Sequence, residues 1–158
     1  DLINISYYHD NKPLLLGIAT DDSHNYHIKS KNNSNTGRGW VMVDSQKLET
    51  SSLINAMESG DFYSSSGVIL KKVYRDDKKM SIEIEPSQGV IYEIIFMGYR
   101  KGSYNVEELK SVTGTSSSYT FQENDFFVRA KIKSSDLVQN PTKIGETKQA
   151  WIQPFKVK

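Results

Sequence analysis

Residues 126–133 read FFVRAKIK, and this stretch decides the fold class. Apolar and basic side chains alternate along it with a period of two residues. The apolar set is Phe126, Val128, Ala130 and Ile132, and the basic set is Arg129, Lys131 and Lys133. This alternation predicts a β-strand that has one face in a core and the other in water.

The same pattern recurs before this stretch. Residues 80–85 (MSIEIE) alternate in the same way, and residues 90–98 (VIYEIIFMG) follow after the turn residues 86–89 (PSQG). Two such runs joined by a turn predict a β-hairpin. A further strand is predicted at residues 119–122, ahead of the turn at residues 123–125 (END).

The C-terminal part continues the β pattern. Residues 150–157 form a short aromatic run interrupted by Pro154, which is typical of a strand at a sheet edge. Residues 134–147 are polar and are expected to be a long loop. Short strands separated by turn residues predict an antiparallel β-sandwich over residues 68–158 and a mainly β (α+β) chain.

The first 67 residues have a different character. Residues 50–60 (TSSLINAMESG) carry N-cap hydroxyls, an apolar face and a terminal glycine, which together predict a helix. The continuous apolar runs 14–20 (LLLGIAT) and 40–43 (WVMV) are typical of strands covered on both sides. Residues 1–67 are therefore expected to be an α/β unit, with the boundary near Gly67.

Composition narrows the classes of function. Basic and acidic residues nearly balance, with 20 Lys and Arg against 19 Asp and Glu, so there is no signature of nucleic-acid binding. The absence of cysteine excludes disulfides and thiolate chemistry. No apolar run is long enough to predict a membrane span. The start at Asp1, without a methionine or a leader, is interpreted as a fragment or a processed product.

A cluster of acids and histidines directly follows the first apolar run. Residues 21–27 read DDSHNYH. In an extended segment, residues i and i+2 point to the same side, so Asp22 and His24 are expected to converge on one divalent ion. Asp21 would then point away or accept a bond from an imidazole, and His27 is a possible third ligand. The alternative is an ordinary solvated loop, because these residue types are common in loops.

Arg38 lies between two glycines in residues 37–39 (GRG). A guanidinium can bind two phosphate oxygens at once, and flanking glycines allow close approach of a substrate. Arg38 is therefore a candidate for binding a substrate phosphate. The alternative is a loop arginine that pairs with a nearby carboxylate.

Five segments in one order resemble a known family. They are GIATDDSHNYH (17–27), GRGWVMV (37–43), LINAMESGDFYSSSG (53–67), FVRAKI (127–132) and AWIQPF (150–155). So arranged, they resemble the closing part of metal-dependent phosphoesterases of the polymerase-and-histidinol-phosphatase (PHP) family, followed by a β-rich tail. The resemblance covers nearly the whole chain.

The resemblance implies a fold and a chemistry. Residues 1–67 would be the last part of a PHP barrel, and residues 68–158 a sandwich that does no chemistry. Asp22 and His24 would be ligands in a cluster of Zn, Mn or Fe ions that activates water against a phosphoester. The family draws most of its metal ligands from upstream strands that this chain lacks. The chain alone is therefore expected to be inactive, and the rest of the parent or another chain should cover its barrel strands.

Three hypotheses follow. The first is a fragment of a metal-dependent phosphoesterase whose parent acts on a phosphorylated substrate. The second is a non-catalytic sandwich that binds carbohydrate or protein, for which an exposed aromatic platform is expected. The third is a degenerate relative of the family with a structural role.

Overall fold

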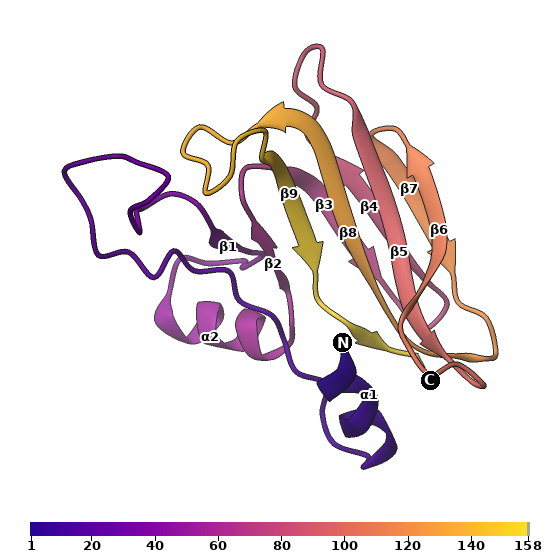
Figure 1. The fold of residues 1–158 in the computed structure, drawn as a ribbon. Helices are drawn as coiled ribbons and strands as arrows, with labels where there is room; N and C mark the ends of the chain where they lie inside the picture. Colours follow the sequence, from indigo (N-terminus) through magenta and orange to yellow (C-terminus); the bar gives the residue numbers. More distant parts are fainter. Residues whose placement is uncertain (158) are drawn as a thin grey trace.

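The computed structural model describes residues 1–157, which form two antiparallel sheets and two short helices (Figure 1). The helices are α1 (Leu2–His9) and α2 (Thr50–Glu58). The strands are β1 (Trp40–Val43), β2 (Phe62–Ser65), β3 (Leu70–Arg75), β4 (Lys79–Ile84), β5 (Tyr92–Arg100), β6 (Glu107–Thr113), β7 (Ser116–Thr120), β8 (Asp125–Leu137), β9 (Thr147–Ile152) and β10 (Phe155–Lys156). The prediction of a mainly β chain with antiparallel sheets is confirmed.

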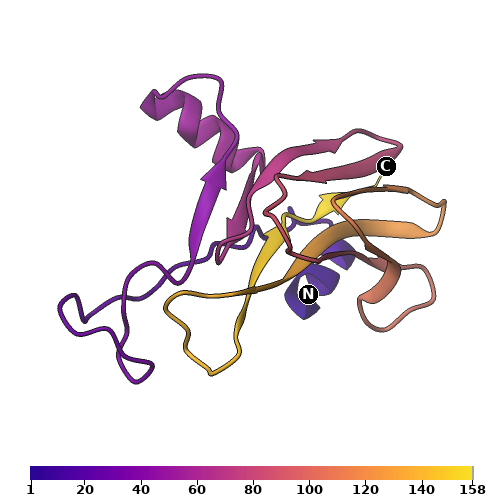
Figure 2. The ribbon, with the colours of Figure 1, turned by 90° about the horizontal axis from the view of Figure 1, so that it is seen from above.

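The two sheets pack face to face, as the view from above shows (Figure 2). The larger sheet has the order β1-β2-β9-β8-β5-β6, with β10 also paired to β8, and the smaller has the order β3-β4-β7. Alternate residues of β4, β5 and β8 point between the sheets. These core residues are Met80, Ile82, Ile84, Ile94, Phe96, Val128, Ala130 and Ile132, each at most 2% exposed. Burial of this apolar face stabilises the pairing of the sheets.

The prediction of a hairpin over residues 80–98 is wrong, because its two strands lie in different sheets. Strand β4 pairs with β3 and β7 in the smaller sheet, whereas β5 pairs with β6 and β8 in the larger one. Residues 85–91 therefore cross from one sheet to the other. Both strands bury their apolar faces in the same core, and an alternating pattern cannot distinguish facing strands from paired ones.

The C-terminal predictions need two corrections. Strand β9 lies inside the larger sheet between β2 and β8 instead of at an edge, and Pro154 separates it from the short β10. The loop predicted at 134–147 is shorter, because β8 continues to Leu137. The main chain at Pro154 makes no ladder bond, so the proline ends a central strand here.

The larger sheet extends across the expected boundary at Gly67. The predicted helix is confirmed as α2, and Gly60 follows it with φ +73°, a left-handed conformation that favours glycine. Strand β1 pairs with β2, and β2 pairs with β9. Strand β1 is an edge strand with partly exposed side chains, so the prediction that residues 40–43 are covered on both sides is wrong.

Residues 14–20 are extended but form no strand, so that prediction is also wrong. The side chains of Leu15 and Ile18 are 45% and 58% exposed. Within residues 1–157 this segment forms no ladder with a strand. Helix α1, which the sequence did not indicate, precedes it and docks through Tyr8, whose ring stacks on Phe126 at 4.5 Å between centroids. Within residues 1–157, neither helix has the length and apolar character needed to cross a bilayer.

Candidate functional site

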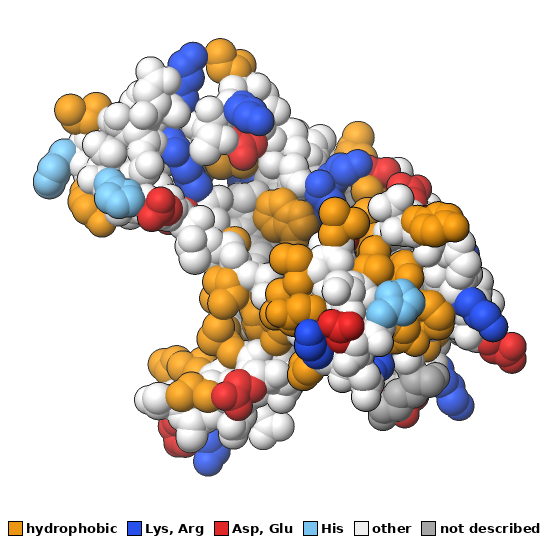
Figure 3. Space-filling model, turned by 60° about the horizontal axis from the view of Figure 1, so that its bottom comes forward, with side chains coloured by type: hydrophobic (Ala, Val, Ile, Leu, Met, Phe, Trp, Pro, Cys, Tyr) orange, Lys and Arg blue, Asp and Glu red, His pale blue; other side chains and the backbone are white. Residues whose placement is uncertain are grey.

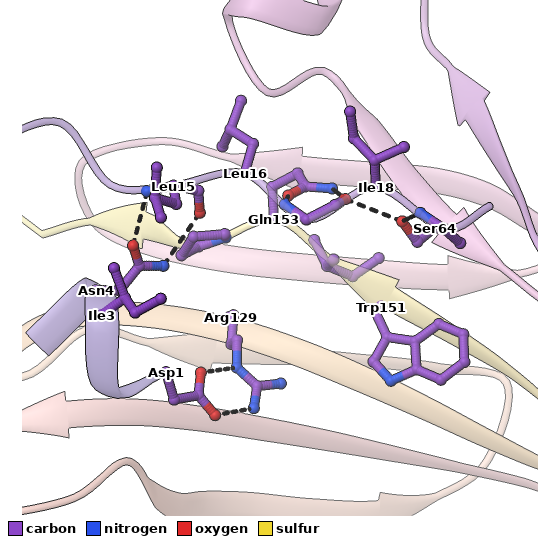
Figure 4. A pocket seen from close by; sticks show the side chains of 14 residues that line it. Asp1, Ile3, Asn4, Leu15, Leu16, Ile18, Ser64, Arg129, Trp151 and Gln153 are labelled. Atoms are coloured by element: carbon purple, nitrogen blue, oxygen red, sulfur yellow. Dashed lines mark hydrogen bonds and ion pairs between the residues drawn. The ribbon is translucent and has the colours of Figure 1, made fainter. Parts of the chain in front are cut away.

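Side chains instead of strand neighbours hold the segment that leads to the predicted metal ligands. The amide of Gln153 accepts a bond from Gly17 N at 2.7 Å and donates to Gly17 O at 2.9 Å (Figure 4). The amide of Asn4 makes the same two-way pair with the main chain of Leu15. Ser64 Oγ accepts from Ala19 N and donates to Gly17 O, both at 3.0 Å. These contacts fix residues 15–19 across β2 and β9.

No local pattern in the sequence predicts this set of contacts. Gln153 and Gly17 are 136 positions apart, and the polar residues themselves are of ordinary types. Only the buried state of Asn4, Ser64 and Gln153 identifies them as groups whose hydrogen bonds must be satisfied internally.

Asp21 has a structural role. Its carboxylate accepts three main-chain N–H bonds, from Gly37 at 2.7 Å, Arg38 at 2.7 Å and Gly39 at 2.6 Å. Charge-assisted bonds of this kind are strong, and they close the base of the loop 21–39. Within residues 1–157 the Asp21 carboxylate bonds to the main chain and to no imidazole, so of the two predicted alternatives the imidazole contact is not seen.

We expect Asp21→Ala to open this loop. Loss of three main-chain bonds lowers the free energy of local opening, so trypsin should cut after the exposed Lys29 or Lys31 several-fold faster. Asp22→Asn is the matched control, because the Asp22 side chain is exposed and Asn tolerates the same backbone conformation. Equal cleavage rates for the two variants would show that Asp21 does not hold the loop.

Asp22 and His24 lie in the exposed part of this loop. Asp22 has φ +47°, so the main chain turns there and the segment is not extended. The expectation that i and i+2 point to one side because the segment is extended therefore fails. His24 Nδ1 instead lies 2.6 Å from the main-chain oxygen of Asp22. Because a carbonyl oxygen only accepts, Nδ1 carries a proton in this contact, and in the neutral ring Nε2 is then the nitrogen that can bind a metal.

The other two candidate residues, His27 and Arg38, differ in their contacts. His27 is exposed in the same loop, and its ring makes no hydrogen bond within residues 1–157. Arg38 donates from Nε to Asn140 O at 3.1 Å and from Nη2 to Ser30 O at 2.9 Å. Its guanidinium thus joins the loop 21–39 to the loop after β8, and it pairs with main-chain carbonyls, not with a carboxylate. Two of its nitrogens are engaged by the protein instead of facing a substrate.

Asp22 and His24 offer one hard oxygen and one borderline nitrogen, a donor set that suits Zn, Mn or Fe. Across residues 1–157, no three side chains of the His, Cys, Asp and Glu types gather to hold a metal ion. The fit to a metal ion therefore rests on the donor types of Asp22 and His24, not on an assembled cluster among residues 1–157. Searches against known protein families, curated proteins and solved structures find no match for this chain.

Proposed function

We propose that this chain is the C-terminal segment of a metal-dependent phosphoesterase of the PHP kind. In this proposal residues 1–67 are the last part of a PHP barrel, and the β-rich remainder has a structural role. Asp22 and His24 contribute two metal ligands, and upstream parts of the protein contribute the others. Bound metal would supply water of lowered pKa and neutralise charge on the phosphoryl oxygens.

The observation that carries the proposal is the state of His24. Its Nδ1 is engaged by the main-chain oxygen of Asp22 at 2.6 Å, and the side chain is exposed. The ring orientation is therefore fixed while Nε2 remains accessible. A contact of this kind selects the tautomer and fixes the ring orientation of a ligating histidine.

A second observation supports the proposal: in the described part of the chain, parts of the N-terminal region have main-chain groups and a strand edge without a partner. Within residues 1–157 the main-chain groups of Leu16 and Ile18 have no hydrogen-bond partner, and β1 has no strand on its outer side. Apolar side chains gather in a hollow between the lobe of the loop 21–39 and the lobe of α2 (Figure 3). A free strand edge beside an apolar surface favours pairing with further chain. The missing barrel strands would provide it.

The test is hydrolysis of p-nitrophenyl phosphate by the full-length protein that contains this segment. Activity should disappear after treatment with a chelator and return on addition of Mn²⁺ or Zn²⁺. The 158-residue chain alone should show none under either condition. Full activity in the chelated protein would refute the proposal.

One observation favours the second candidate, a carbohydrate-binding module. Tyr74 is 40% exposed on the outer face of the smaller sheet. It lies in one cross-strand row with Ser81 and Ser118 beside a shallow hollow. An exposed ring next to hydroxyl groups suits the apolar face and the hydroxyls of a sugar.

If this face binds glycans, Tyr74→Ala should lower retention of the chain on immobilised polysaccharide several-fold, since a favourably stacked ring contributes roughly 0.5–1.5 kcal/mol. Affinity electrophoresis measures this retention. Tyr104→Ala is the control, because Tyr104 is 92% exposed outside the row. No retention of the unmodified chain on any polysaccharide would remove this candidate.

A further inference from the structure

A cleft opens beside residues 15–19, and no residue of the loop 21–39 lines it. It has a volume of about 560 Å³ and opens between α1, residues 15–19 and the outer face of β8 and β9. Its walls are largely apolar, with Ile3, Leu15, Ile18 and Trp151 among the lining side chains (Figure 4). This size and lining suit a small organic molecule.

One cation lies at the base of this cleft. Arg129 projects from β8 on the face opposite the core, and its side chain is only 18% exposed. Burial lowers the pKa of the Arg129 guanidinium below its usual value. A cation that has lost much of its water needs an anion close by.

The protein itself supplies a carboxylate there. Arg129 Nε donates to Asp1 Oδ1 at 2.8 Å, and Arg129 Nη2 donates to Asp1 Oδ2 at 2.6 Å. This two-point geometry is the one that a guanidinium makes with any carboxylate. The Asp1 side chain is 35% exposed, so its position is reachable from solvent. Asp1 therefore marks where the head group of an outside ligand would bind.

The remaining polar groups of the cleft are already used. The amides of Asn4 and Gln153 and the hydroxyl of Ser64 bond to the main chain of residues 15–19. A ligand in this cleft would therefore be recognised by the guanidinium of Arg129 and by apolar contacts with the wall. Next along the same face, burial and then the charges of Lys133 and Arg129 lower the pKa of Lys131, so the surroundings favour an anion further.

We propose that this cleft binds a small amphipathic carboxylic acid, with its carboxylate on Arg129 and its apolar body against Ile18 and Trp151. The Asp1 side chain competes with the ligand for the guanidinium and moves aside when the ligand binds. Arg129 lies between Asp1 and Trp151, so the head group and the apolar wall are adjacent (Figure 4). This inference does not depend on the metal loop.

The probes are octanoate and octan-1-ol, which share an apolar chain and differ in the carboxylate. Titration of the 15N-labelled chain should give saturable shifts of the Trp151 indole and Arg129 Nε signals. Octanoate should bind at least about tenfold more tightly than octan-1-ol, a ratio that corresponds to one charge-assisted pair.

Variants distinguish binding of octanoate in this cleft from nonspecific hydrophobic binding. Asp1→Asn should strengthen octanoate binding several-fold, because it removes the competing charge. Arg129→Gln should abolish the preference for octanoate over octan-1-ol. Lys133→Gln is the control and should change neither, since Lys133 pairs with Glu93 at 3.0 Å outside the cleft. Equal binding of both probes to the unmodified chain, or unchanged octanoate binding by Asp1→Asn, would overturn the proposal.

Discussion

Replacement of Asp125 by alanine is expected to lower the free energy of unfolding by about 3 kcal/mol or more. The Asp125 side chain is fully buried at the start of β8. Its carboxylate accepts bonds from Arg100 Nε at 2.8 Å, Tyr119 Oη at 2.9 Å and Gln122 N at 2.8 Å. Alanine would leave the partly buried guanidinium of Arg100 without its counter-ion, and the link between β5, β7 and β8 would be lost.

Urea unfolding followed by circular dichroism measures this loss. Glu83→Ala is the control, because Glu83 pairs with Lys71 in an exposed ion pair and should leave the urea midpoint nearly unchanged. A second readout is the pKa of Tyr119, which burial and then the bond to Asp125 raise above its usual value. This pKa should fall in Asp125→Ala. Similar urea midpoints for the Asp125 and Glu83 variants would contradict the assigned role.

The second large effect concerns catalysis in the full-length protein. We expect His24→Ala to lower kcat/KM for p-nitrophenyl phosphate at least about 100-fold, because even residues that only orient metal ligands cost 10- to 100-fold when removed. Asp22→Asn should act in the same direction, since it removes the hard anionic oxygen and keeps the backbone conformation.

His27→Ala is the matched control for this prediction. His27 is a histidine of the same exposed loop, three positions further along, without a hydrogen bond that would fix its ring. Its replacement should leave kcat/KM within about twofold. Equal losses in the His24 and His27 variants would indicate that the loop as a whole, and not a defined ligand, matters for turnover.

Local sequence patterns predicted where the strands of this protein lie better than they predicted which strands pair. The alternation in residues 80–85 and 126–133 placed β4 and β8 correctly, because the side-chain period of a strand is a property of the strand itself. The pairing of β4 and β5 was wrong, because strands that face one another across a core carry the same alternation as paired strands. Strand β9 was placed at an edge because Pro154 follows it, although its pairing with β2 and β8 is set by distant residues.

The candidate site shows a similar limit. The sequence predicted a buried strand directly before residues 21–27, but residues 14–20 form no strand, and Leu15 and Ile18 are 45% and 58% exposed. Residues 22–24 are not extended as predicted, because Asp22 has φ +47°. The clamp by Asn4, Ser64 and Gln153 could not be predicted, since it joins side chains to a main chain far away in the sequence.

The most direct test of the metal-site proposal is anomalous diffraction from crystals of the full-length protein grown with Mn²⁺ or Zn²⁺. We predict an anomalous peak at roughly 2.0–2.2 Å from His24 Nε2, with the carboxylate of Asp22 bound to the same ion. A metal coordinated without either residue, or a His24 ring that binds it through Nδ1, would contradict the proposed site.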